Sequence, residues 1–147
     1  MKLLTRKYNI KANIERVFYC FSDTDYILQE IKRLNKNNKI KVVKKDQMLE
    51  FKGKSTLFRL KKLEVKEPFL YRAQIIPIDN TLLKFGNATL TCKFGENSGE
   101  TDVQVEMHSE KNPKLLWKVY IKIIIYILML QSRSDEKRYI KKIEQCY

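Results

Sequence analysis

The strongest pattern in the chain is a long apolar segment after Pro113, which is typical of a helix. On a helical wheel the apolar side chains of 115–130 cover most of the circumference, and Lys118 and Lys122 form the main polar strip. Neither Gly nor Pro occurs after Pro113, so the helix can continue to Tyr147 and would then be about 50 Å long. A helix this apolar must be covered on more than one side. The pattern therefore predicts that the rest of the chain wraps around it.

The last part of this predicted helix carries its apolar residues Tyr139, Ile140 and Ile143 on roughly the opposite side of the wheel. Either the helix bends near 131–134, or its last part packs against something else. Surplus apolar surface remains on the first part. It could form a homodimer interface, face a membrane, or reflect only the high Ile content, and it comprises Trp117, Ile121, Ile125 and Leu128.

The first third of the chain predicts one strand followed by two short helices. Residues 2–10 alternate between apolar and polar side chains, as in a strand with one wet face. Apolar residues at helical spacing then follow from Ile14 to Phe21, and Asn13 is a suitable N-cap. Asp23 marks a corner after which a second helix continues through Leu34. The pattern is therefore a strand, a helix, a sharp corner and a helix.

From residue 39 to 110 the period is two, interrupted by turn residues, which predicts about six antiparallel strands. Phe58 and Leu60 share one parity, whereas Leu63 and Val65 share the other, so we expect a β-bulge near Lys61-Lys62. Residues 52–55 and 95–99 are predicted hairpin turns, and Gly86 falls inside a strand expected over 82–94. The middle of the chain is thus predicted to be a meander.

Together these elements predict an α+β fold in a single domain of residues 1–147. The expected order is β, α, α, six strands and α, with a curved seven-stranded antiparallel sheet wrapped around a long C-terminal helix. An antiparallel sheet that is apolar on one face needs a cover, and the terminal helix supplies it.

The order of elements and one short motif resemble the START-like (SRPBCC) helix-grip superfamily, which includes plant pollen allergens, lipid-transfer START domains and polyketide cyclases. The stretch from Ile10 to Phe18, followed by Phe21-Ser22-Asp23, is similar to the superfamily's strand end, helix start and Asp-led corner. Asn13 stands where Pro is common. The resemblance implies a hydrophobic cavity between sheet and helix for a lipid-like, quinone or polycyclic molecule. It does not imply one activity, because the superfamily contains carriers, sensors, cyclases and ribosome-binding members.

The residues expected to line such a cavity are the inward-facing apolar ones of the sheet and the terminal helix. For each of them plain core packing is favoured over a ligand contact, since apolar stripes usually only pack. Tyr71 and Tyr120 are the sharpest candidates, because a buried phenol needs a hydrogen-bond partner that a ligand could supply. The predicted ligand-binding set is Phe51, Phe58, Tyr71, Leu90, Val105, Met107, Tyr120, Ile123, Ile124 and Ile127.

Catalytic chemistry is not indicated by the residue pattern. The single histidine, His108, has the parity of the wet strand face, and Cys20 and Cys92 fall on apolar faces as small hydrophobes. We expect no catalytic residue, metal or cofactor, and a non-enzymatic role is favoured over an enzymatic one. A polyketide cyclase or dehydratase stays an alternative, and it would need Arg59, Arg72 or Tyr71 to face the cavity.

The net charge of +13 has two interpretations. Attraction to phosphate would make the protein a basic adaptor for RNA or the ribosome, or bring it to an anionic membrane surface. Codon bias would explain the same charge, because 23 of the 30 basic residues are Lys and only 7 are Arg. A functional basic face is predicted along the lysines of the first strands of the meander, Lys39, Lys41, Lys44, Lys45, Lys52, Lys54, Lys61 and Lys62.

Location and topology follow from the cysteines and the apolar runs. Three widely spaced cysteines argue against a disulfide framework and favour a reducing, cytoplasmic location. The N-terminus has no signal-peptide pattern. The uncharged run from Ile123 to Leu130 is far short of the ~20 residues needed to cross a bilayer. We therefore expect no membrane-spanning segment.

Overall fold

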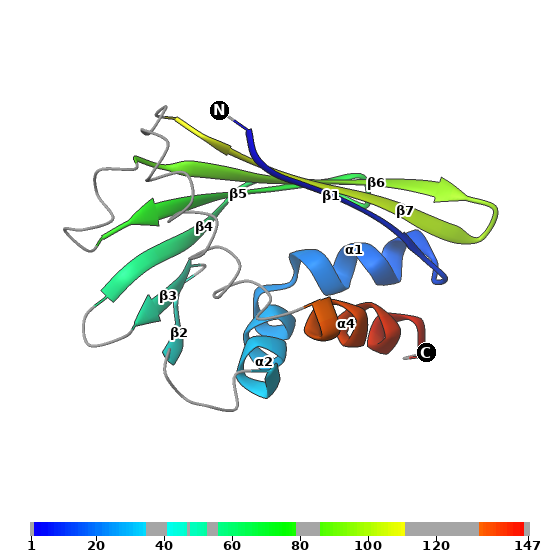
Figure 1. The fold of residues 1–147 in the computed structure, drawn as a ribbon, viewed down its shortest axis with the longest axis horizontal. Coiled ribbons are helices and arrows are strands. Elements are labelled where there is room, and N and C mark those ends of the chain that lie inside the picture. The colour runs from blue at the N-terminus through cyan, green and yellow to red at the C-terminus, as the bar shows by residue number, and fades with distance from the viewer. Residues whose placement is uncertain are drawn as a thin grey trace.

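The computed structural model describes residues 2–34, 41–46, 48–52, 56–78, 86–110 and 133–145. Figure 1 shows one curved sheet with the helices gathered on one of its faces, which we call the concave face; the opposite face is the outer face. The elements in chain order are β1 Lys2–Ile10, α1 Ile14–Ser22, α2 Thr24–Leu34, β2 Lys41–Lys45, β3 Met48–Lys52, β4 Thr56–Lys66, β5 Leu70–Pro77, β6 Ala88–Asn97, β7 Glu100–Ser109 and α4 Arg133–Gln145.

The predicted strand, helix and helix of the N-terminal third are confirmed, and local capping explains both helix starts. The Asn13 side chain accepts a hydrogen bond from the backbone N–H of Arg16 at 2.9 Å. The Asp23 carboxylate accepts one from the backbone N–H of Tyr26 at 2.8 Å. Each cap satisfies a backbone donor that the first helical turn leaves free. Asp23 also ends α1, where its backbone N–H donates to the Tyr19 carbonyl, so the corner follows from one residue that caps both helices.

The sheet has seven antiparallel strands in the order β1-β7-β6-β5-β4-β3-β2, and β1 and β2 form its two open edges. Strands β2 to β7 are the predicted meander of six, and β1 joins it by pairing with β7. Because β1 pairs with β7, the chain must cross one face of the sheet to reach β2 at the opposite edge. The helices α1 and α2 leave β1 directly and lie on that face (Figure 1).

The predicted bulge is confirmed in β4, where the pairing register with β5 shifts between Lys62 and Glu64. Before the shift, Leu60 pairs with Ile75, and after it Val65 pairs with Tyr71. Ile75 and Tyr71 lie on the same face of β5, so the bulge brings both halves of β4 onto the concave face despite their opposite parity in the sequence.

The β6–β7 hairpin is tighter than the five-residue loop expected from its sequence. Gly95 and Glu96 still pair with β7, and the turn is only Ser98-Gly99, with φ values of 51° and 84°. Two successive residues with positive φ are the mark of the hairpin turn that matches strand twist. Gly86 was also expected inside a strand, but it precedes β6 and has a φ of 67°.

Two apolar clusters form the core on the concave face. The larger cluster joins α1 to strands β5, β6 and β7, and Phe18 and Phe21 both contact the ring of Phe94 edge-on at centroid distances of 5.3 and 5.7 Å. The smaller cluster lies under α2 at the β2 edge, where Phe51 stacks on Phe58 at 4.4 Å. Leu60 and Ile75 pack against both clusters and connect them.

The C-terminal helix α4 packs into the larger cluster. Ile143 is completely buried there, and Tyr139 and Ile140 pack beside it. The Tyr139 hydroxyl donates to the backbone carbonyl of Cys20 on α1, and the Glu144 carboxylate accepts from the backbone N–H of Lys11 at 3.2 Å. The apolar side predicted for this last part of the chain therefore faces α1 and the end of β1. The predicted apolar helix over 115–130, its proposed homodimer interface and the suggested bend at 131–132 lie outside the described residues.

Candidate functional site

The structure places the six described members of the predicted ligand-binding set on the concave face, all of them buried. Tyr71, Leu90, Val105 and Met107 belong to the larger cluster, whereas Phe51 and Phe58 form part of the smaller one. All six residues are therefore part of the packed core. A contact between any of them and a ligand stays a prediction. The other four members lie outside the described residues: Tyr120, Ile123, Ile124 and Ile127.

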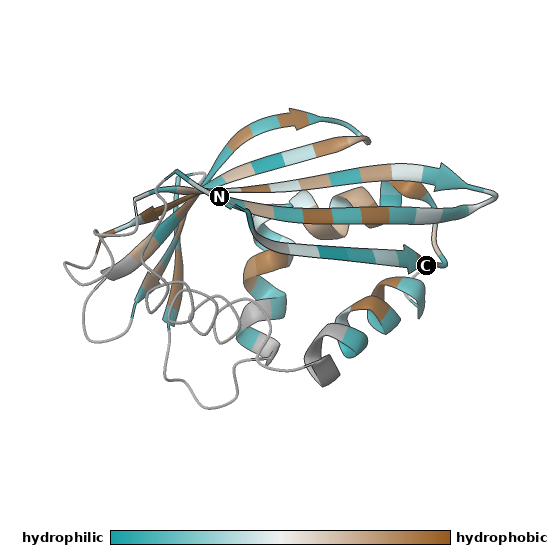
Figure 2. Ribbon diagram, turned by 45° about the horizontal axis from the view of Figure 1, so that its top comes forward, coloured by the Kyte–Doolittle hydropathy of each residue, from teal (hydrophilic) through white to brown (hydrophobic). Residues whose placement is uncertain are grey.

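A second group of residues surrounds the bulge in β4, and we call it the concave strip: Lys62, Leu63, Val65 and Tyr71. Tyr71 is buried, whereas Val65 is 43% exposed and Leu63, the bulge residue without a cross-strand partner, is 47% exposed. Val65 pairs directly with Tyr71, and Lys62 pairs with the buried Ala73. Figure 2 shows the apolar colouring continuing to the end of the β4–β5 hairpin. The apolar concave surface therefore extends beyond the part that is buried.

Tyr71 is the polar residue at the buried end of the concave strip. It is only 3% exposed, and its hydroxyl forms no hydrogen bond with any other described residue. Burial, and then the nearby Cys92, raise the pKa of Tyr71 to about 12. The phenol therefore stays protonated at neutral pH and keeps a hydrogen to donate.

Lys62 is the basic residue of the concave strip. Its Nζ lies 6.0 Å from the centroid of the Tyr71 ring, at the outer limit of a cation–π contact. It forms no ion pair with a described carboxylate. Lys62 had been expected on the same basic face as Lys61, and this prediction is wrong, because consecutive residues of a regular strand point to opposite faces of the sheet.

The sequence pattern did not identify Lys62, Leu63 or Val65 as site residues. The available signal was the change of parity in β4, which located the bulge but not the exposure of the residues beyond it. Exposure depends on how far α1 and α2 extend over the sheet, and no local pattern in β4 encodes that distance.

The two arginines that a cyclase would need on the concave side face the other way. Arg59 Nε donates to the Glu50 carboxylate at 3.0 Å, and Arg72 donates to the Glu64 carboxylate at 3.1 Å. Both alternate along their strands with concave-face core residues, so both lie on the outer face. Of the three residues named for that activity, only Tyr71 points to the concave side.

Glu50 is a buried carboxylate at the centre of a basic region on the outer face. It is 2% exposed and lies 3.8 Å from Lys45 and 3.4 Å from Lys52, in addition to its contact with Arg59. Burial opposes ionisation of Glu50, but hydrogen bonds from Lys52 and Arg59 outweigh it and lower its pKa. The carboxylate therefore holds several cations on one face of β2, β3 and β4.

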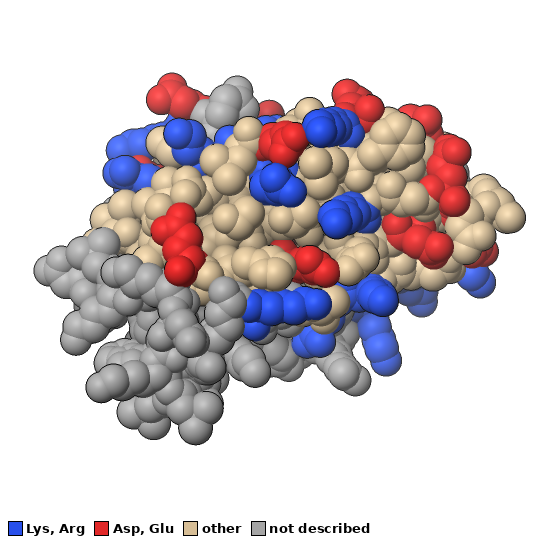
Figure 3. All heavy atoms as spheres, turned by 90° about the horizontal axis from the view of Figure 1, so that it is seen from above, with Lys and Arg blue, Asp and Glu red and all other residues tan. Residues whose placement is uncertain are grey.

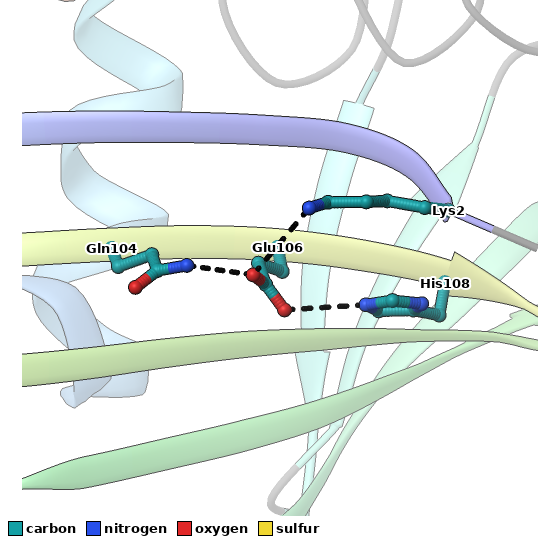
Figure 4. A network of polar contacts seen from close by, with 4 residues as sticks. All are labelled: Lys2, Gln104, Glu106 and His108. Carbon is teal, nitrogen blue, oxygen red and sulfur yellow. Dashed lines mark hydrogen bonds and ion pairs between the residues drawn. The ribbon is translucent and has the colours of Figure 1, made fainter.

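The single histidine lies on the outer face, as predicted, and is about half exposed. Figure 4 shows Glu106 of β7 between Gln104, Lys2 and His108. His108 Nε2 is 3.3 Å from the Glu106 carboxylate, and Lys2 Nζ is 3.7 Å from it. The hydrogen bond with His108 is the main cause that lowers the pKa of Glu106. These exposed contacts are a surface network, as expected for a polar strand face.

The described residues contain no group of three or more His, Cys, Asp or Glu side chains that could hold a metal ion. Cys20 and Cys92 are both buried thiols without a disulfide, and burial raises the pKa of Cys92 to about 12. A thiol with a raised pKa is a poor nucleophile. Within the part of the chain that the structure describes, no helix is long and apolar enough to cross a membrane.

Comparison with solved structures relates this architecture to known proteins. The chain is similar to protein CV1439 from Chromobacterium violaceum, with 15% identity, a TM-score of 0.61, and coverage of 97% of this chain and 98% of that chain. It is also similar to Ara h 8.0201, with 12% identity, a TM-score of 0.58, and coverage of 95% of each chain. An HSP90 activator from Plasmodium falciparum matches with 10% identity, a TM-score of 0.55, and coverage of 85% of this chain and 94% of that chain.

The chain has a helix-grip fold. Its open seven-stranded antiparallel sheet with a C-terminal helix, together with these neighbours, establishes the predicted fold class. At identities of 15% or lower the likeness carries the fold and not the function. No family model matches the sequence, and no curated protein matches it either.

Proposed function

We propose that the protein binds a hydrophobic small molecule on the concave face of its sheet, against the concave strip. The observation that carries this proposal is the exposure of Val65 on the same face as the core, beside the exposed bulge residue Leu63. Apolar surface held in water is unfavourable, and a ligand that covers it gains about 25 cal/mol per Å². The buried phenol of Tyr71 beside these side chains offers one polar contact to orient such a molecule.

Membership of the START-like superfamily belongs to the same proposal. The helix-grip fold supports it, and so does the Asp23 cap at the corner between α1 and α2, which matches the Asp-led corner of the superfamily's opening motif. We propose a non-enzymatic carrier or sensor in the cytoplasm, with a lipid-like, quinone or polycyclic ligand. Tyr120, Ile123, Ile124 and Ile127 remain proposed contacts of that ligand.

A matched pair of valines tests this function. Val65 is on the concave face and Val43 of β2 is on the outer face, and their exposed fractions are similar at 43% and 39%. We expect Val65→Asp to weaken binding of the neutral fluorophore N-phenyl-1-naphthylamine about tenfold or more, because a carboxylate replaces about 1.5 kcal/mol of apolar contact. Val43→Asp should leave its affinity unchanged. Fluorescence titration measures both, and thermal unfolding checks that both variants are folded.

The proposal fails if the wild-type protein does not bind the fluorophore in this titration. It also fails if Val65→Asp and Val43→Asp weaken binding equally, because the bound molecule would then lie elsewhere.

A second candidate function is contact with RNA through the outer face of β2, β3 and β4. Apart from Lys66, which contacts Glu64 at the far end of β4, the strand register places five described basic residues there, Lys41, Lys45, Lys52, Arg59 and Lys61. Lys41 and Lys52 are direct cross-strand partners, and like charges in that position repel each other unless an anion lies between them. Lys44 does not contribute, because its ammonium is 2.9 Å from the Asp25 carboxylate of α2. Lys39 and Lys54, also predicted for this face, lie outside the described residues.

The remaining outer face does not favour RNA in the same way. Figure 3 shows basic and acidic side chains interspersed over it. We therefore expect any RNA contact to be confined to the five-residue basic region. We rank it below ligand binding because, among the described residues on that face of β2, β3 and β4, no aromatic side chain accompanies the five cations as a stacking platform.

The salt dependence of RNA binding tests this second function. The variant Lys41→Gln/Lys61→Gln should reduce the slope of log affinity against log salt by about 1 to 2, since each phosphate contact contributes about 0.7 to 0.9. Lys7→Gln/Lys93→Gln removes two exposed lysines from other parts of the outer face and should leave the slope unchanged. Fluorescence anisotropy of a labelled single-stranded RNA measures the slope. Equal loss in both variants, or binding to anionic vesicles without binding to RNA, would contradict the assignment.

A further inference from the structure

The side chain of Lys62 ends in an ammonium group and lies on the concave face, where the apolar core also lies. Lys62 alternates with Lys61 in regular register from Leu60, which places it on the concave face opposite the buried Ala73. The other described lysine on this side of the β2–β4 region, Lys44, is neutralised by Asp25 of α2. Lys62 has no described carboxylate partner, so its charge is not compensated within the part of the chain that the structure describes.

The carboxylate next in sequence to the strip is not available to Lys62. Glu64 lies on the outer face, where it is 3.1 Å from Arg72 and 3.3 Å from Lys66. Lys62 and Glu64, on either side of the bulge, therefore have opposite charges and lie on opposite faces of the sheet. Of these two charges, only that of Lys62 lies on the concave face.

Tyr71 adds a second hydrogen-bond donor to the same place. Its ring lies beneath the Lys62 ammonium at 6.0 Å, and its hydroxyl has no described acceptor. An ammonium and a protonated phenol are both donors, and no hydrogen bond joins the Lys62 ammonium to the phenol oxygen of Tyr71 or either group to another described residue. A molecule that fits this surface must therefore bring an acceptor, and a negatively charged one satisfies both groups best.

We propose that the ligand is an amphipathic monoanion of the long-chain carboxylate class, whose carboxylate is held by Lys62 and Tyr71 and whose chain covers Leu63 and Val65. This inference rests on the proposed function of the concave strip and adds the chemical class of the ligand. Long-chain amines and quaternary ammonium amphiphiles are excluded by charge, and neutral amphiphiles bind through their chains alone.

Two ligands that differ only in the head group test the inference on the full chain. We expect oleate, kept below its aggregation concentration, to bind the wild-type protein about tenfold more tightly than oleyl alcohol in isothermal titration, because only oleate brings an anionic acceptor to the Lys62 ammonium. Lys62→Gln should remove that difference by lowering the affinity for oleate. Lys61→Gln removes the neighbouring lysine from the outer face and should preserve the full difference.

The outcomes separate this inference from the function on which it rests. Equal binding of oleate and oleyl alcohol by the wild-type protein overturns the ligand class and leaves hydrophobic binding intact. A preference for oleate that survives in Lys62→Gln, or is lost in Lys61→Gln, overturns the assignment to Lys62. Failure of the wild-type protein to bind oleate, oleyl alcohol and the neutral fluorophore removes the proposed function itself.

Discussion

Replacing Lys142 with Met is expected to lower the free energy of unfolding by about 3 kcal/mol. Lys142 of α4 donates to the carboxylate of Glu30 of α2, and Glu30 is 4% exposed. The substitution leaves a buried carboxylate without its ion-pair partner on α4. The free-energy cost of that buried charge exceeds the stabilisation that the ion pair itself provides. Lys142 is itself about one-third exposed, which places the effect at the low end of the range for buried pairs.

Two further variants distinguish this cause from a general loss of side-chain packing. Lys141→Met changes the exposed neighbour on the same helix and should alter stability by less than about 0.5 kcal/mol. The double variant Glu30→Met/Lys142→Met should recover most of the loss, because it removes the buried charge together with its partner. Urea unfolding followed by circular dichroism measures all three. A double variant less stable than Lys142→Met would refute the electrostatic explanation.

Ile143→Ala is expected to cost about 3 kcal/mol of stability. Ile143 is completely buried in the cluster that joins α1 to strands β5, β6 and β7. Truncation removes its apolar contacts and leaves a cavity that the rigid sheet cannot close. The size of the loss reports how firmly α4 is part of the core.

Ile140 is the matched control, because it lies one helical turn earlier on α4 and is only partly buried. Ile140→Ala should therefore cost clearly less than Ile143→Ala in the same urea titration. Equal costs for the two variants, or a loss below about 1 kcal/mol for Ile143→Ala, would mean that α4 does not pack as the structure shows.

Local signals in the sequence were sufficient for much of the fold. Asn13 and Asp23 fix both helix starts because a cap acts on backbone donors only three residues away. The period of two after residue 39 gave the six strands of the meander, and the parity change gave the bulge in β4. Parity also placed His108 on the outer face, where it contacts Glu106.

The candidate site was only partly accessible from the sequence. Tyr71 could be chosen because its parity and its polar hydroxyl are both visible in the pattern. Lys61 and Lys62 were grouped on one basic face, although alternation from Phe58 and Leu60 places Lys62 on the concave face and Lys61 on the outer face. Arg59 and Arg72 could not be excluded until their contacts with Glu50 and Glu64 showed them on the outer face.

Pairs of residues distant in the chain could not be foreseen at all. The contact between Glu30 and Lys142 spans 112 positions, and that between Cys20 and Tyr139 spans 119. In the sequence, each of these four residues has only the pattern of an ordinary helix position. Their partnership exists only because α4 is placed beside α1 and α2 on the concave face.

By itself, the sequence determined the order of the elements, the parity of each strand and the caps of the helices, because each depends on neighbours within a few residues. Only the tertiary structure decided how far the helices cover the sheet. That coverage buries Tyr71 and leaves Leu63 and Val65 half exposed. Burial is a property of elements packed from distant parts of the chain, so the accessible part of the concave face could be found only after folding.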